Sequence, residues 1–88
     1  MVINIVDLKK KIIYRATYRG TKEMDKLLVA FTKKYIDKFD NLELKYLSDL
    51  LDIDDENLFR FNQGQETSIH INLNQVSRLF KNFSFKND

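Results

Sequence analysis

The sequence predicts an all-α fold, a small bundle of five helices in one domain spanning residues 1–88, with an ordered core from about residue 7 to residue 83. Three observations support this prediction. The chain has no Pro and only two Gly, so few positions interrupt a helix. Apolar residues recur three and four positions apart along most of its length. A chain of 88 residues buries enough surface for one modest core.

Gly20 separates the first two predicted helices. The first is expected from Asp7 to about Tyr18, and the second from about Thr21 to Asp37. Lysines occupy much of the opposite side of the first helix, so each helix is expected to bury only one face. The apolar residues at helical spacing are Leu8, Ile12, Ile13 and Ala16 in the first helix and Met24, Leu27, Leu28, Phe31 and Tyr35 in the second.

Acidic cap residues mark the next two helices. Asp40, followed three positions later by Glu43, resembles a capping box and predicts a third helix from Asn41 to about Leu51. Asp54 is placed to cap a short fourth helix that ends before Gly64. The apolar stripe of the third helix consists of Leu42, Tyr46, Leu47, Leu50 and Leu51.

Residues 68–73 combine signals for a strand and for a loop. Ile69, Ile71 and Leu73 alternate with polar residues, as they would in a strand. A single strand is not stable without a partner, so an extended approach to the last helix is favoured. That helix is predicted from about Asn72 to Asn82. Its inner face would carry Val76, Leu79, Phe80 and Phe83.

The composition excludes several classes of chemistry. The chain has no Cys and a single His, so disulfides, thiolate metal sites and a Cys nucleophile are excluded. The acidic residues from 49 to 56 do not form a calcium loop, because a loop starting at Asp52 would need Gly and Glu where Asn57 and Gln63 stand. No nucleophile motif surrounds His70, and no Gly-rich phosphate loop is present. The sequence therefore predicts a protein that is not an enzyme.

No segment of the sequence resembles a membrane anchor or a leader. The apolar runs are far shorter than the roughly 18–20 residues that cross a bilayer, and the N-terminal run is too short for a signal peptide. A cytoplasmic protein of the bacterial type, with no leader sequence, is expected.

Charge is distributed unevenly along the chain. Residues 1–38 carry ten Lys or Arg against four acids, and residues 39–88 carry five against nine. The basic half could be a solvated face, or it could meet an acidic partner, either nucleic acid or protein. In a nucleic-acid complex, bases would stack on Tyr14 or Tyr18. The cations that would then contact phosphates are Lys9, Lys10, Lys11, Arg15, Arg19 and Lys22. The net charge of only +2 argues against this alternative.

The segment Arg19-Gly20-Thr21-Lys22-Glu23 differs in kind from the rest of the chain. Gly20 at a helix junction frees the backbone for the turn and removes a side chain where a partner could approach. Arg19 is expected to be exposed, with a planar fork that suits carboxylates or backbone carbonyls on another protein. Glu23 could point outward to the same partner, reach back to cap the second helix, or do both. The sequence therefore predicts a protein-contact surface here.

Two segments resemble a known family. Residues 18–28 (YRGTKEMDKLL) resemble the R-G-x-x-E signature of the SdhE-type succinate dehydrogenase assembly factors. Residues 54–59 (DDENLF) are similar to the D-D-x-x-L-[FY] segment of that family, and the resemblance covers roughly residues 7–82. The chain departs from the family after Phe59, where the sequence reaches Gly64 early, so a fourth helix shortened by about half a turn is expected.

The resemblance implies a chaperone-like assembly factor of five helices. Such a factor binds the flavoprotein subunit of succinate dehydrogenase, or of the related fumarate reductase, and promotes covalent attachment of FAD to a histidine of that subunit. This flavinylation needs no nucleophile from the factor, and FAD is the cofactor of the client, not one held stably by this chain. A monomer that uses neither a membrane nor nucleic acid is expected. The partner-binding residues implied by position are Arg19, Gly20 and Glu23 in the motif, Asp25 after it, and Arg15 and Tyr18 beside it.

Overall fold

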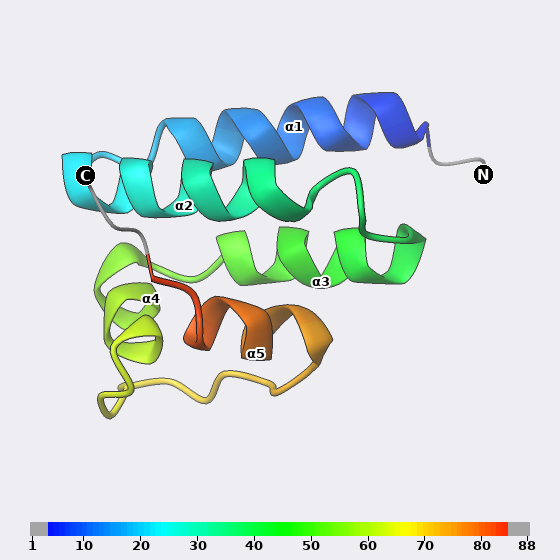
Figure 1. The fold of residues 1–88 in the computed structure, drawn as a ribbon. Helices are drawn as coiled ribbons and strands as arrows, with labels where there is room; N and C mark the ends of the chain where they lie inside the picture. The colour runs from blue at the N-terminus through cyan, green and yellow to red at the C-terminus, as the bar shows by residue number, and fades with distance from the viewer. Residues whose placement is uncertain (1–3, 85–88) are drawn as a thin grey trace.

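The structure is a computed structural model that describes residues 4–84. Within this range the chain forms five α-helices and no strand, which confirms the all-α prediction (Figure 1). The helices are α1 (Ile5–Thr17), α2 (Lys22–Tyr35), α3 (Asn41–Leu51), α4 (Asp55–Asn62) and α5 (Gln75–Lys81). None of the helices in the described range is long and apolar enough to cross a bilayer.

The helices are stacked in layers, with α1 on one outer side. α1 packs against α2 and α3, and α5 packs against the other side of α3. α4 is turned across the ends of these helices and contacts α5 (Figure 1). The turn between α1 and α2 and the start of α4 therefore lie at the same end of the molecule.

The core contains residues from all five helices. Phe31 is fully buried on α2, and its ring centroid lies 5.2 Å from that of Phe80 and 5.3 Å from that of Phe83. On α3, Leu44 is 1% exposed, whereas Leu42, predicted to be in the apolar stripe, is 53% exposed. The prediction for Leu42 was wrong because a residue two positions from Leu44 lies about 200° around the helix from it.

The predicted caps position the helices correctly. Asp40 accepts the Glu43 N–H at 2.9 Å and Glu43 accepts the Asp40 N–H at 3.1 Å, so the predicted capping box is confirmed.

The last helix was predicted to start near Asn72, but it begins at Gln75. The reason is a reciprocal cap, in which Asn74 accepts the Ser77 N–H and the Ser77 hydroxyl accepts the Asn74 N–H.

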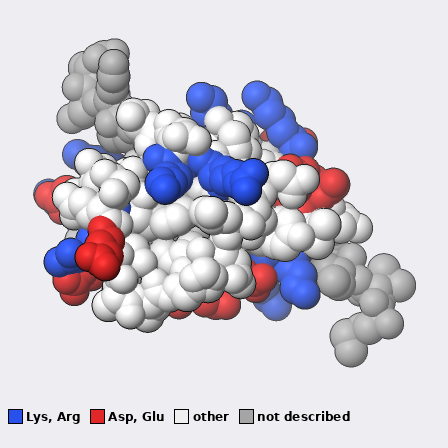
Figure 2. All heavy atoms as spheres, turned by 90° about the horizontal axis from the view of Figure 1, so that it is seen from below, with Lys and Arg blue, Asp and Glu red and all other residues white. Residues whose placement is uncertain are grey.

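An extended segment, residues 63–74, connects α4 to α5 without forming a strand. Ile71 on this segment is buried, and Ser68 donates its N–H to the Asn57 side chain at 2.9 Å. The predicted extended approach is therefore confirmed. Seen from below, most of this face of the molecule is uncharged, with Lys or Arg side chains in its upper middle part and acidic side chains toward its edges (Figure 2). The only Asp, Glu, Lys or Arg in residues 61–77 is Glu66.

The cap of α4 gives a prediction about pH. The Asn57 side chain and backbone N–H both donate to the Asp54 carboxylate, and these bonds hold the pKa of Asp54 below its usual value. A lowered pKa in the folded state means that the carboxylate stabilises the fold above its unfolded pKa and loses that effect as pH falls through the folded pKa. We therefore expect Asp54→Ala to be less stable than wild type near neutral pH, with a difference that shrinks in acid. Urea unfolding from about pH 6 to about pH 2 measures this, and a constant difference would contradict it.

Candidate functional site: the α1–α2 turn and an adjoining hollow

The turn between α1 and α2 is a sharp reversal built around Gly20. Tyr18 caps the end of α1, and Gly20 has a φ of +104°, a conformation that other residues rarely adopt. Thr21 then caps α2 by accepting the Met24 N–H at 3.4 Å. The Asp25 carboxylate accepts the Arg19 N–H at 2.7 Å. The turn is thus held by side chains of the turn and of the start of α2.

Arg19 is directed into the protein. Its side chain is only 12% exposed, and its Nε donates to Asp55 Oδ1 at 2.8 Å. Its Nη1 donates to the Leu51 carbonyl at 2.6 Å, and its Nη2 donates to the Ile53 carbonyl. The expected fork does bind a carboxylate and backbone carbonyls, but they belong to the same chain. The predicted exposure of Arg19 was therefore wrong, and its side chain joins the turn to the connection between α3 and α4.

Two of the four cations of α1, Lys9 and Arg15, also pair with acids of the same chain. Arg15 donates to the Ser48 hydroxyl at 3.0 Å and pairs with Asp52, both contributed by α3 or its C-cap. Lys9 pairs with Asp37 at 3.2 Å. Together with the pair between Arg19 and Asp55, these contacts join the basic half of the chain to acidic residues. Two of these pairs, Arg15 with Asp52 and Arg19 with Asp55, join the basic half of the chain to the acidic half.

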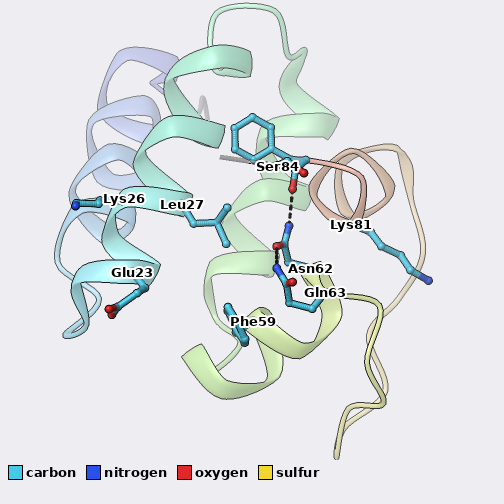
Figure 3. A pocket seen from close by; sticks show the side chains of 9 residues that line it. Glu23, Lys26, Leu27, Phe59, Asn62, Gln63, Lys81 and Ser84 are labelled. Carbon is cyan, nitrogen blue, oxygen red and sulfur yellow. Dashed lines mark hydrogen bonds between the residues drawn. The ribbon is translucent and has the colours of Figure 1, made fainter. Parts of the chain in front are cut away.

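Glu23 is exposed at the start of α2 and does not cap it. A capping box would place the glutamate at the third helical position, but Thr21 is the N-cap, so Glu23 is second and Met24 is third. Among the hydrogen bonds of the described residues, none involves the Glu23 carboxylate. The capping role proposed for Glu23 is therefore wrong. Glu23 is one of the residues that line a neighbouring hollow, and its carboxylate points away from the centre of that hollow (Figure 3).

This hollow lies between the start of α2, the outer side of α4 and the end of α5 (Figure 3). Its volume is about 420 Å³. The lining residues are Glu23, Lys26 and Leu27 from α2, Phe59, Asn62 and Gln63 at α4, and Lys81, Phe83 and Ser84 at the end of α5.

The floor of the hollow is held by hydrogen bonds to Asn62. Its side-chain amide donates to the carbonyls of Phe80 and Phe83 at 2.8 and 2.9 Å, and its oxygen accepts from Gln63 at 2.8 Å. These bonds join the ends of α4 and α5. The hollow is therefore a preformed feature that offers a fixed shape to a partner.

Phe59 is an exposed aromatic residue of the hollow that was not predicted as a site residue. It is 44% exposed in the hollow, whereas Phe61, two residues later, is 8% exposed in the core. A signal for this was present, because residues two apart on one helix face in nearly opposite directions, so the two rings cannot share one face. The family resemblance included Phe59, but no functional role was assigned to it.

The hollow is lined by charged, polar and aromatic side chains. Its rim carries Glu23, Lys26 and Lys81, whose charged ends point away from its centre, and Phe59 contributes an exposed aromatic ring (Figure 3). Among the described residues, no cluster of His, Asp and Glu could hold a metal ion. This arrangement can hold a polar and aromatic segment of another molecule in place.

Of the six residues implied as partner-binding, the structure assigns three to internal contacts. Arg15, Arg19 and Asp25 hold the turn and α1 against the rest of the domain. Glu23, Gly20 and Tyr18 are exposed. The surface available to a partner at this end of the molecule therefore consists of these three residues together with Phe59 and the rest of the hollow.

Substitution of Gly20 is expected to destabilise the turn by an amount that does not depend on side-chain size. Nothing lies within 4 Å of a Cβ built at this position, so the cost comes from the backbone alone. We expect Gly20→Ala and Gly20→Arg each to lower the free energy of unfolding by about 1–2 kcal/mol. Urea unfolding followed by circular dichroism measures both. A much larger loss for Gly20→Arg would show that the space is occupied.

Comparison with known protein families identifies the family of this chain. The family described as flavinator of succinate dehydrogenase matches residues 10–84, a range that contains the turn and every residue lining the hollow. No curated protein and no solved structure gives a significant match. Because the family match covers most of the chain, the protein belongs to the succinate dehydrogenase flavinator family.

Proposed function

We propose that this protein binds the flavoprotein subunit of succinate dehydrogenase, or of the related fumarate reductase, and promotes covalent attachment of FAD to it. Family membership supports the flavinylation role. One structural observation supports the location of the site. The two segments of the resemblance, 18–28 and 54–59, are joined by the pair between Arg19 and Asp55, and each contributes an outward residue, Glu23 and Phe59, to one hollow.

The contact with the client would combine shape and charge. Phe59 would pack against an apolar group of the client, because exposed aromatic side chains are enriched in the buried centres of interfaces. Glu23 would accept hydrogen bonds from an Arg or Lys of the client. Gly20 would allow the backbones to approach closely, since no side chain projects from the turn at that point.

The proposed mechanism is non-catalytic. The bond to be formed joins a histidine of the client to the flavin of the client, so this chain contributes only by favouring the client conformation in which those two groups meet. Shifting a conformation from 1% to 99% of the population requires about 10⁴-fold tighter binding to the favoured state. The binding residues of the hollow would supply this difference, and the chain is not expected to hold FAD stably. A monomeric state and a cytoplasmic location stay predictions.

The proposal is tested by reconstitution. The purified chain is mixed with the apo flavoprotein subunit and FAD, and covalent flavin is followed by fluorescence of the denatured subunit. We expect wild type to raise the initial rate, and Glu23→Gln to reduce that gain about tenfold through loss of a charged hydrogen bond. Glu66→Gln is the matched control, because Glu66 is exposed on the extended segment and does not line the hollow.

Two results would count against this proposal. Absence of binding and of any gain in covalent flavin with wild type would refute the function. An equal loss for Glu66→Gln and Glu23→Gln would refute the hollow as the site. Gly20→Arg and Gly20→Ala give a further comparison, because they share the backbone strain and differ only in the bulk presented to the client.

The nucleic-acid alternative loses much of its basis in this structure. Three of the six cations assigned to phosphate contacts, Lys9, Arg15 and Arg19, are paired with carboxylates of the same chain. Lys10, Lys11 and Lys22 remain, which is a small electrostatic footprint for a nucleic-acid-binding domain. We do not propose nucleic-acid binding.

A further inference from the structure

The outer side of α1 carries an unusual concentration of exposed apolar and aromatic residues. Of the eight large hydrophobic side chains that are exposed in the described part of the chain, three lie on α1 and a fourth, Tyr18, caps it. α1 already buries Ile12 and Ala16 against the domain. In Figure 1 it forms an outer layer, with the other helices on one side of it only. The exposed residues therefore form a second apolar surface on a helix whose inner face is already covered.

Three of these side chains lie in one row along the helix, with Lys10 between the first and the second. Val6, Lys10, Tyr14 and Tyr18 are four residues apart, so they lie one above the next along the helix. Tyr14 and Tyr18 are 65% and 69% exposed, and their ring centroids are 4.7 Å apart. We refer to this row, with the adjoining Ile13 and Lys11, as the α1 outer face.

The charge of this face is basic. Lys10 and Lys11 are exposed, and neither takes part in an ion pair within residues 4–84. This differs from their neighbours Lys9 and Arg15, which both pair with acids of the same chain. Asp7 is the only acidic residue of α1 and lies in its first turn. The uncompensated lysines predict a partner surface that is acidic.

We infer that the α1 outer face is a second docking surface for the flavoprotein subunit, which would present to it an acidic segment with apolar side chains. This inference rests on the proposed function. Tyrosine provides a large contact area, a polar hydroxyl and little loss of side-chain entropy, which makes it frequent at protein interfaces. Tyr18 immediately precedes the turn at Arg19, so the α1 outer face adjoins the candidate site along the chain.

Other occupants fit these residues less well. The centroids of the two tyrosine rings are 4.7 Å apart and the rings are inclined at 49°, so they leave no parallel gap for a nucleobase between them, and only two lysines that are unpaired within residues 4–84 adjoin them for phosphate contacts. Lys10 lies in the middle of the row, between Val6 and Tyr14. Insertion of the row into a lipid bilayer would therefore place the charge of Lys10 in the hydrocarbon layer. An acidic protein surface can neutralise that charge while it covers the rings.

The test separates the lysines from the tyrosines by kinetics. Association of the full chain with the flavoprotein subunit is measured by biolayer interferometry at about 50 and about 300 mM salt. Lys10→Glu with Lys11→Glu should lower the association rate about tenfold and remove most of its salt dependence, because exposed charges act mainly on encounter. Tyr14→Ala with Tyr18→Ala should instead raise the dissociation rate about tenfold.

One control variant makes the same change in net charge at another place, and a second one tests whether the alanine pair acts by disturbing the helix. Lys33→Glu with Lys45→Glu makes the same change in net charge on α2 and α3 and should leave the association rate near that of wild type. Tyr14→Gln with Tyr18→Gln preserves helix formation and should reproduce the effect of the alanine pair.

The possible outcomes distinguish the two hypotheses. If wild type neither binds nor raises covalent flavin, the proposed function and this inference both fail. If wild type is active and the α1 substitutions change neither rate, only this inference fails. Tight binding of wild type to phosphatidylglycerol vesicles or duplex DNA, lost in the lysine variant while client binding is retained, would also overturn it.

Discussion

Arg19→Ala is expected to lower the free energy of unfolding by about 3 kcal/mol. The substitution removes three donors and leaves the Asp55 carboxylate and the carbonyls of Leu51 and Ile53 without their present partner. Asp55 is largely buried with Arg19, so solvent replaces these bonds only in part. Domains of this size have a stability of roughly 5–15 kcal/mol, so the loss is a large fraction of the total.

Urea unfolding at neutral pH measures this effect, and two comparisons make it specific. Arg60→Ala removes an exposed ion pair with Glu56 and should change the stability by less than about 1 kcal/mol. Arg19→Lys keeps the charge but cannot satisfy three acceptors, so it should fall between wild type and Arg19→Ala. Equal losses for Arg60→Ala and Arg19→Ala would show that the internal role of Arg19 is wrong.

Arg19 also shows where sequence reasoning stops. Its chemistry could be predicted, since an arginine fork does prefer carboxylates and carbonyls. Its partners could not, because they lie more than thirty residues away and come close only after α3 and α4 have packed. A local pattern contains no information on such a contact. The same holds for Arg15, which bonds to Ser48 through the packing of α1 on α3.

Helix caps and breaks, which depend only on residues close together in the sequence, were predicted correctly in most cases. The capping box at Asp40 and Glu43, the cap at Asp54 and the break at Gly20 depend on neighbours three or four positions away. Errors of one position had consequences, however. A capping role for Glu23 would require the N-cap of α2 at Gly20, three residues before it, but the N-cap is Thr21. The hollow itself combines three helices, so no single segment predicts it.

Phe59→Ala is expected to weaken binding to the flavoprotein subunit about 30-fold, which corresponds to about 2 kcal/mol for an interface anchor. The ring is 44% exposed in the hollow, so its removal opens no cavity in the core. The free energy of unfolding should therefore fall by only about 1 kcal/mol, from the part of the ring that is buried. Isothermal titration calorimetry with the purified subunit measures the first quantity, and urea unfolding measures the second.

Two substitutions elsewhere separate an anchor from a general effect of losing apolar surface. Leu42→Ala removes an exposed side chain from α3 outside the hollow and should leave client binding unchanged. Phe61→Ala removes a core ring on the same short helix and should cost about 3–5 kcal/mol of stability. If Phe59→Ala destabilises the fold as Phe61→Ala does, Phe59 is a packing residue. If Phe59→Ala neither destabilises the fold to that extent nor weakens binding to the client, the hollow is not the contact site. Loss of client binding by a Phe59→Ala variant that stays folded would show that α4 turns one face to the core and the other to the client.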